Sequence, residues 1–278
     1  TRHLIANWLP RLGIEGRFVT LDELARPASV IGPRTRMVWL ESPINPTLRC
    51  VNVAAVAAAC RQAGVTSVVD NTFASPINQP VLAMGVDLSM QSATKYLNGH
   101  SDVTAGVLSG TRALLEPIAK ARRLMGATLD PMPAYALGRG LKTLALRVAQ
   151  HNANALRVAR AMEGHPGLVR VYYPGLESHP DHAVARIQMS GFGGMVTIDV
   201  KGGRDAAFRA FDRLRLIKRA ASLGGVESLC SLPILTSHHG LSDAELASAG
   251  VSVGMIRLSI GLEDADDLVE DLTYALGN

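Results

Sequence analysis

The chain has 278 residues, of which 47% are hydrophobic and 19% charged, and its formal net charge is +4. This length and composition fit one large or two ordinary globular domains with a buried core. Only 4% of the residues are aromatic and the basic residues are scattered, so the basic stripe and aromatic platforms of a nucleic-acid-binding protein are lacking. No apolar run approaches the roughly 20 residues of a membrane-spanning helix, so we expect no membrane contact.

The chain has three cysteines, Cys50, Cys60 and Cys230, and they form no Cys-x-x-Cys pair. An odd number without that spacing favours free thiols over a disulfide framework or a zinc site. We therefore expect a reducing compartment such as the cytoplasm, and no metal. The first residues do not have the layout of a signal peptide.

The first half of the chain alternates helix-like and strand-like segments. Helical periodicity occurs at residues 3–12, from residue 21, at 53–63 and at 81–84. Short apolar runs typical of buried strands occur at 16–19, 36–41, 66–70, 87–91 and 106–110. This order and spacing predict an α/β fold with a mostly parallel sheet and helices on both of its faces.

Polar side chains follow three of these predicted strands. Asn45 lies in the proline-containing loop after 36–41, Asp70 ends the run 66–70, and Lys95 comes just after 87–91. In parallel α/β sheets, ligands bind beyond the carboxyl ends of the strands. We therefore expect these three groups to lie on one rim of the sheet.

The second half begins with a long helical stretch, residues 134–163, which Arg139-Gly140 can interrupt. We expect this helix to bridge two domains, a cofactor-binding domain of residues 1–140 and a C-terminal α/β domain of residues 141–278. Strand-like runs at 168–173, 194–200 and 255–260 predict a solvated antiparallel sheet, with helices at 205–214 and 264–276. Arg257 lies inside the last of these strands.

Lysine is scarce, with five in the chain, and Lys95 differs from the others in its surroundings. Lys120, Lys142 and Lys218 lie in helix-like runs, where a solvated amine is the ordinary interpretation. Lys95 follows a strand and is framed by small hydroxyl residues. An amine that loses its proton in such a loop can form a Schiff base with an aldehyde.

The polar groups near Lys95 match the needs of an aldehyde cofactor that carries a pyridine ring and a phosphate. Lys95 would bind the aldehyde, and an acid such as Asp70 would keep the ring nitrogen protonated. Ser92 and Thr94 flank the lysine and could bind the phosphate. Each has an ordinary alternative: Asp70 as a helix-capping or turn residue, and the two hydroxyls as a plain turn.

Six ordered blocks extend this pattern along the chain: ESPINP at 41–46, VDNTFASP at 69–76, SATKYLNGHSD at 92–102, GRGLKTL at 138–144, SLGGVESL at 222–229 and IRLSIGLED at 256–264. With these blocks the sequence resembles the pyridoxal-phosphate enzymes of cysteine and methionine metabolism. That family includes cystathionine γ-synthases, cystathionine γ- and β-lyases, methionine γ-lyases and homoserine sulfhydrylases. The resemblance implies a type I aminotransferase-like fold with a smaller C-terminal α/β domain.

The resemblance also implies roles for individual residues around the cofactor. Lys95 would hold the cofactor and move protons, and Asp70 would pair with the ring nitrogen. Ser92 and Thr94 would bind the phosphate, Asn45 would lie near the ring hydroxyl, and Thr72 would lie against the ring face.

For the substrate, the resemblance implies that Arg257 grips the α-carboxylate as a bidentate fork, which suits arginine better than lysine. Ser222 would assist it, and Thr236 is a further candidate near the same carboxylate. The sequence around Thr236 departs from the family pattern, since residues 235–239 read LTSHH where many members have Met-Thr-His.

The activity implied is elimination or replacement at Cγ or Cβ of sulfur amino acids or homoserine esters. The block at 222–229 resembles cystathionine γ-synthase and γ-lyase more than the sulfhydrylases. Homoserine sulfhydrylase, methionine γ-lyase and cystathionine β-lyase remain alternatives, and so does a non-catalytic fragment that retains the fold. The family implies a homotetramer and a further N-terminal segment, which we expect this sequence to lack. A nucleotide-binding protein is excluded because 191–195 has neither G-x-G-x-x-G nor P-loop spacing.

Overall fold

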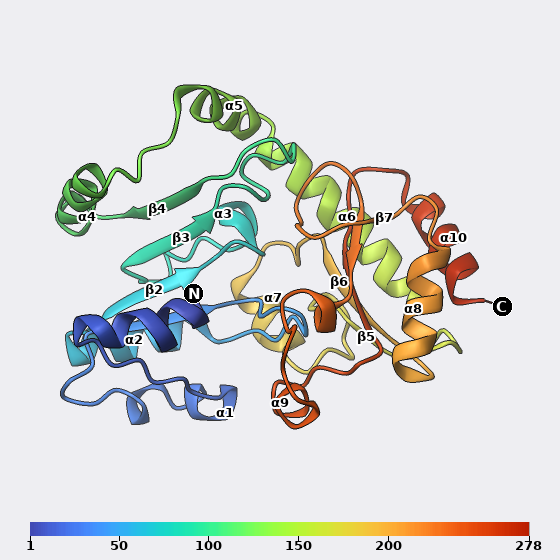
Figure 1. Ribbon diagram of the computed structural model, residues 1–278, viewed down its shortest axis with the longest axis horizontal. Helices are drawn as coiled ribbons and strands as arrows, with labels where there is room; N and C mark the ends of the chain where they lie inside the picture. The colour runs from blue at the N-terminus through green and yellow to red at the C-terminus, as the bar shows by residue number, and fades with distance from the viewer. Residues whose placement is uncertain (278) are drawn as a thin grey trace.

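The computed structural model describes residues 1–277, which form a mixed α/β structure built on two β-sheets. The first sheet has the order β1-β2-β3-β4, formed by Met37–Glu41, Thr66–Asp70, Leu88–Ser92 and Gly106–Gly110. The second has the order β5-β6-β9-β8-β7, formed by Leu168–Tyr172, Met195–Val200, Met255–Ser259, Leu229–Ser231 and Lys218–Arg219. In Figure 1 the first sheet lies on the left and the second on the right.

In the first sheet, β1, β2 and β3 are parallel, as predicted, whereas β4 pairs antiparallel with β3. Helix α2 (Val53–Ala63) follows β1, and its buried side chains pack against those of β1 and β2. The Asn52 side chain caps this helix by accepting a hydrogen bond from the Ala55 amide. Gly64 ends it with a φ of +65°, a conformation that favours glycine. Both ends of α2 match the sequence prediction.

In the second sheet, the pairs β5–β6, β6–β9 and β9–β8 are antiparallel, and β7 runs parallel to β8. Strands β6 and β9 are buried along their whole length, so the prediction of a solvated sheet is wrong for them. One face packs in a core with α6 (Leu144–Met162), α8 (Gly203–Arg213) and α10 (Ala265–Leu276). The other face meets the loop after β1, since the Thr197 hydroxyl donates to the Pro46 carbonyl at 2.7 Å.

The predicted long helix is two helices, α5 (Pro131–Leu141) and α6, separated at Lys142 and Thr143. The break lies just after the Arg139-Gly140 pair that the sequence marked. Before them comes α4 (Arg112–Met125), none of whose residues is buried. Figure 1 shows α4 and α5 at the outer edge of the first sheet and α6 leading into the second half. The remaining short helices are α1 (Leu21–Leu24), α3 (Ser75–Asn78), α7 (His182–Gln188) and α9 (Asp243–Ser248).

Some local predictions are wrong. Residues 16–19 form no strand, because this exposed segment has no neighbouring strand with which to pair. Residues 81–84 form successive hydrogen-bonded turns rather than a helix, being confined between Pro80 and Gly85. The segment 3–12 is helical, as predicted, but as a π-helix (Leu4–Trp8) followed by a 3-10 helix (Leu9–Leu12). Lys218 lies in β7 and not in a helix.

Within the described residues, no helix combines the length and apolar character that crossing a bilayer requires. The same residues hold no cluster of three or more His, Cys, Asp or Glu side chains suited to a metal ion. Cys50, Cys60 and Cys230 are buried free thiols, as expected. Burial raises the pKa of the Cys50 and Cys230 thiols to about 12, so both are protonated at neutral pH.

A buried carboxylate fixes the segment that leads into β7. Asp271 on α10 accepts hydrogen bonds from the amides of Arg215, Leu216 and Ile217 at 2.8, 3.0 and 2.9 Å. The side chain is buried, and these three donors occupy both of its oxygens. Hydrogen bonds to a charged group in such a place contribute more than neutral ones.

We expect Asp271→Asn to lower the free energy of unfolding by about 2 kcal/mol, because one carbonyl oxygen cannot serve three amides and the new NH₂ group faces donors. Urea denaturation followed by circular dichroism measures this. The neighbouring exposed residue provides the control, since Glu270→Gln makes the same chemical change and should cost less than about 0.5 kcal/mol. Equal losses in the two variants would contradict the role assigned to Asp271.

Candidate active site

The carboxyl ends of β1, β2 and β3 meet at one edge of the first sheet. Glu41 and Asp70 are paired at the ends of β1 and β2, and Asp70 is paired with Met90 of β3. Asn45 follows β1 in its loop, and Lys95 lies on the turn just after β3. The structure therefore places Asn45, Asp70 and Lys95 on one rim, as the strand order predicted.

The Lys95 amine reaches the second half of the chain. Its Nζ donates a hydrogen bond to Ser222 Oγ at 2.8 Å, across a separation of 127 residues. Partial burial and the charge of Arg257 lower the pKa of this amine, which increases the neutral, nucleophilic fraction. Ser222 itself has a φ of +104°, a strained conformation for a residue with a side chain, and such strain is often found at functional sites.

Arg257 lies in the middle of β9 and is only 9% exposed. Its Nη1 donates to Asn45 Oδ1 and its Nη2 to the Ser222 carbonyl, both at 3.1 Å. Its Nε is buried and has no hydrogen-bond partner within residues 1–277. Burial lowers the pKa of the guanidinium. A buried arginine that contacts only neutral groups and keeps a spare donor is suited to binding an anion such as a carboxylate.

Asp70, Thr72 and Ser92 form a second hydrogen-bonded group at the rim. Asp70 Oδ1 accepts from the Thr72 amide at 3.1 Å and from the Thr72 hydroxyl at 2.6 Å. Thr72 Oγ1 accepts in turn from the Ser92 amide at 2.8 Å. Within the described residues, Asp70 Oδ2 accepts no hydrogen bond, so one carboxylate oxygen can receive a further donor.

The two remaining predicted residues are placed differently. Thr94 Oγ1 accepts from the Ala105 amide at 3.0 Å, and so ties the Lys95 turn to the segment before β4. The Thr236 hydroxyl donates to the Leu232 carbonyl and makes no hydrogen bond to any other predicted site residue in residues 1–277. Nearby, burial and the charges of Arg2 and Arg257 lower the pKa of His238. The residue of this segment that interacts electrostatically with Arg257 is thus His238 and not Thr236.

Sequence reasoning missed Arg147, which holds the turn after Lys95 from behind. This side chain of α6 is only 5% exposed, and it donates to the carbonyls of Tyr96 and Gly140 at 2.8 Å each. It also bonds the Leu97 carbonyl and the Thr143 hydroxyl. A helical arginine is usually exposed, so its position in the sequence gives little indication of this role.

A buried pair lies beside that turn. The Tyr96 and His151 rings meet edge to face with centroids 5.2 Å apart, and both residues are almost fully buried. His151 Nδ1 lies 2.7 Å from the Ile260 carbonyl, which can only accept, so Nδ1 carries the proton. Burial, above all, lowers the pKa of His151 from 6.5 to about 4. The ring is therefore neutral at physiological pH.

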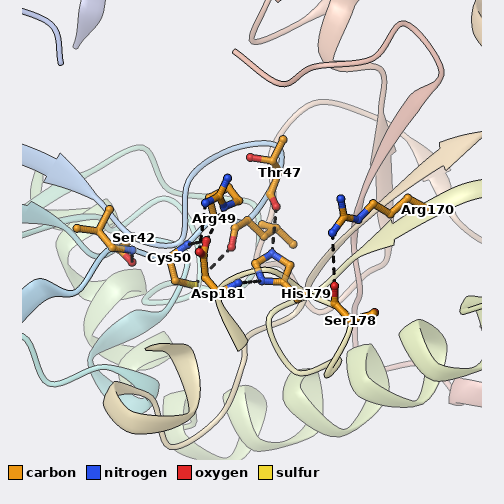
Figure 2. Close-up of polar contacts among 10 residues, drawn as sticks. Ser42, Thr47, Arg49, Cys50, Arg170, Ser178, His179 and Asp181 are labelled. Atoms are coloured by element: carbon orange, nitrogen blue, oxygen red, sulfur yellow. Dashed lines mark hydrogen bonds and ion pairs between the residues drawn. The ribbon is translucent and has the colours of Figure 1, made fainter. Parts of the chain in front are cut away.

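The loop that carries Asn45 is fixed by the second half of the chain. Figure 2 shows Arg49 and Cys50 of this loop beside Asp181, and Thr47 beside His179. Asp181 and His179 precede α7, far from the loop in sequence. The site thus combines the rim of the first sheet with β9 and the segments around it.

The chain matches the family described as Cys/Met metabolism PLP-dependent enzyme over residues 1–277, and it belongs to this family. It is 42% identical over 277 residues to cystathionine gamma-synthase 1, chloroplastic, of Nicotiana tabacum, covering 99% of this chain and 51% of the relative. It is also 42% identical over 266 residues to L-methionine gamma-lyase of Pseudomonas putida, covering 95% and 67%. With cystathionine gamma-lyase of Bacillus subtilis the identity is 39% over 279 residues, covering 100% and 73%. The chain thus spans about half the length of the tobacco relative.

The family implies pyridoxal phosphate, and the side chains at the rim fit this cofactor. Lys95 offers an amine with a lowered pKa to the aldehyde. Asp70 keeps a carboxylate oxygen without a hydrogen-bond partner in the described part of the chain, as a protonated ring nitrogen would need. The buried Nε of Arg257 is a donor without a partner there, as a substrate carboxylate would need.

We expect the stability of the protein to fall as the pH drops from 6.5 towards 4, because of His151. In this window the unfolded chain binds a proton at this ring and the folded chain does not, so the free energy of unfolding decreases with decreasing pH. The shift from 6.5 to about 4 corresponds to about 3 kcal/mol when complete. His179, whose pKa burial also lowers, acts in the same direction.

Urea unfolding at pH 7 and pH 4.5 measures the effect, with His151→Gln as the non-titrating comparison. The variant is expected to lose markedly less stability than the parent between these two pH values, whatever its stability at pH 7. Equal losses in both proteins would show that His151 does not take up the proton.

Proposed function

We propose that the protein containing this chain is a pyridoxal-phosphate-dependent enzyme that catalyses elimination or replacement at Cγ or Cβ of sulfur amino acids or homoserine esters. Its favoured activity is that of a cystathionine γ-synthase or γ-lyase, in trans-sulfuration. The observation that carries this proposal is the meeting of Lys95, Ser222 and Arg257, which places a nucleophilic amine beside a buried carboxylate-binding group.

When bound, pyridoxal phosphate supplies an aldehyde for amines and a ring that accepts electrons. Arg257 binds and orients the substrate α-carboxylate, with Asn45 and Ser222 holding its guanidinium. Lys95 Nζ moves a proton at Cα and then at the leaving group, a role that requires its neutral form. Burial of Arg257 limits competition from water for the carboxylate.

The remaining site residues are assigned to the cofactor. Asp70 would pair with the ring nitrogen through Oδ2, which has no partner within residues 1–277, and Thr72, which bonds Asp70 Oδ1, would lie against the ring. Ser92 binds the phosphate, and Thr94 shares this role while its oxygen anchors the loop to Ala105. Asn45 would lie near the ring hydroxyl, as the family resemblance implies. Thr236 is assigned near the substrate carboxylate, and its hydroxyl would have to leave the Leu232 carbonyl to bind it.

Several activities of the family share this chemistry. They differ in which nucleophile, or water, reacts with the substrate once its leaving group has departed. Relatives named L-methionine gamma-lyase, cystathionine beta-lyase and O-succinylhomoserine sulfhydrylase are 40–42% identical to the chain. These activities therefore remain alternatives for its substrate. A non-catalytic fragment that retains the fold is the alternative of another class, and the pairing of Lys95 with Ser222 argues against it.

We assign the fold to the type I aminotransferase-like class, with a cofactor-binding domain of residues 1–140 and a C-terminal α/β domain of residues 141–278. The separate sheets and the break before α6 support this division. The three free thiols support a reducing compartment such as the cytoplasm.

We also propose that copies of the chain associate, as a dimer of dimers, through α4 and α5. Helix α4 has no buried residue, and its apolar side chains Leu124 and Met125 are 79% and 81% exposed. On α5, Met132 and Tyr135 are 70% and 69% exposed. Such a group of exposed apolar side chains is typical of a surface that another protein covers, and a second copy of the chain is the occupant we assign.

The double variant Leu124→Glu, Met125→Glu is expected to lower the molar mass measured by light scattering, because two carboxylates would be buried in the interface. The control is Ile187→Glu, which alters a side chain that is 85% exposed on α7 and should leave the mass unchanged. A monomeric parent protein, or the same mass in both variants, would contradict this assembly.

The function is tested by adding pyridoxal phosphate, reducing with borohydride and mapping the modified lysine. We expect visible absorbance from the bound cofactor and a single label on Lys95, and Lys95→Ala should lose both while keeping its fold. Lys142→Ala is the control, because this residue lies at the end of α5, outside the site. Label on other lysines only, or no absorbance in excess cofactor, would refute the assignment.

A further inference from the structure

The loop of residues 42–51 belongs to the first sheet by connection but is held by the second half of the chain. It runs from β1 to α2 and carries Asn45, whose side chain contacts Arg257. Figure 2 shows where Thr47, Arg49 and Cys50 of this loop meet His179 and Asp181. The position of Asn45 therefore depends on contacts that lie outside the catalytic groups.

Asp181 makes the strongest of these contacts. Its Oδ2 accepts from Arg49 Nε at 2.6 Å and its Oδ1 from Arg49 Nη2 at 3.2 Å. The same Oδ2 accepts from the Cys50 amide at 2.8 Å. The Asp181 side chain is 15% exposed, whereas the carboxylate of the Arg157–Asp266 pair is 73% exposed. A shielded bidentate pair contributes more than an exposed one.

His179 and Thr197 support the part of the loop that precedes Arg49. His179 Nδ1 accepts from the Asp181 amide at 3.2 Å, so Nε2 carries the proton and points to the Thr47 carbonyl at 3.4 Å. The Thr197 hydroxyl donates to the Pro46 carbonyl at 2.7 Å. Pro46 and Thr47, the two residues that follow Asn45, are thus tied to the second half.

A short path of hydrogen bonds joins Asp181 to Arg257. The Arg49 carbonyl accepts from the Ile44 amide at 2.9 Å, which closes the loop on itself. Ile44 directly precedes Asn45, and Asn45 Oδ1 accepts from Arg257. A displacement of Arg49 would therefore move Asn45 away from the guanidinium.

We propose that Asp181 is a positioning residue: by clamping Arg49 and Cys50 it holds the Asn45 loop against Arg257 and so determines how tightly the site binds the substrate carboxylate. This inference rests on the proposed function. Lys95 lies on a separate turn that Arg147 holds, so loss of the clamp should weaken carboxylate binding more than it changes proton movement at Lys95.

The test compares the full-length protein with its Asp181→Asn variant, which keeps the shape of the side chain but loses its charge and one acceptor. We expect KM for the amino-acid substrate to rise about 5- to 10-fold with kcat within about 2-fold, the pattern of lost binding without lost chemistry. Asp181→Glu should restore part of the affinity. Asp266→Asn is the matched control and should change neither value.

Two further measurements do not depend on turnover. Butyrate carries a carboxylate but no amine, and its Kd, measured by ligand-observed NMR, should rise about 5-fold in Asp181→Asn. Amide exchange across residues 42–48 should become about 10-fold faster, while exchange in the Lys95 turn stays unchanged. Arg49→Met should give the same changes, and the double variant should add little, because the two residues form one contact.

The outcomes separate the clamp from the function it serves. Faster exchange with an unchanged butyrate Kd would overturn the inference, because Asp181 would then only stabilise the loop. Unchanged amide exchange across residues 42–48 in Asp181→Asn would overturn it as well. So would a fall in kcat that is matched by a fall in cofactor absorbance, because Asp181 would then act on cofactor binding. If Lys95 takes up no cofactor, the proposed function fails, but the butyrate and exchange measurements still decide whether Asp181 positions Arg257.

Discussion

The site depends on a buried guanidinium that has no carboxylate partner among residues 1–277. Arg257 lies in the fully buried strand β9, and within those residues it donates to an amide oxygen and a backbone carbonyl. Removing such a charge from water is costly, and two neutral acceptors compensate for it only in part. Burial, and after it the charge of Arg257, lower the pKa of Lys95 and so favour its neutral amine. The buried guanidinium thus contributes to the chemical character of the neighbouring amine as well as offering its own donors.

Both halves of the chain contribute to the surroundings of the buried Arg257 guanidinium. Lys95 comes from the rim of the first sheet, and Ser222 and Arg257 come from the second half. Helix α6 connects the halves and contributes Arg147, which holds the Lys95 turn by its carbonyl groups. His151 of the same helix binds the Ile260 carbonyl, just after β9. The two contacts fix the lysine and the arginine strand to one rigid helix, which keeps the site preorganised.

The sequence predicted the first sheet and its polar rim well, because hydrophobic runs and proline or glycine boundaries are local signals. It placed Asn45, Asp70 and Lys95 together through the strand order alone. It could not reveal the Lys95–Ser222 contact, which spans 127 residues. Strands β7 and β8 were also missed, since two or three residues are too short to show a period. Arg147 and Asp181 carried no signal, because charged residues of their kind are usually exposed.

Four charged groups of this chain differ in how fully they use their hydrogen-bonding capacity. Asp271 and Asp181 each accept three hydrogen bonds from nearby donors, so both of their oxygens serve the fold. Asp70 uses one oxygen on Thr72, and Arg257 retains an unpaired Nε, both within residues 1–277. Leaving such capacity unused costs stability, which a fold tolerates where a ligand supplies the missing partner. Unused capacity is not confined to them, since Gln91 Nε2, Tyr96 Oη, Asn98 Oδ1, His151 Nε2 and Ser231 Oγ are also buried without a partner in the same residues. Asp70 and Arg257 differ from these five groups in carrying a charge, which a ligand of opposite charge can compensate, and they are the two that we propose for the ring nitrogen and the substrate carboxylate.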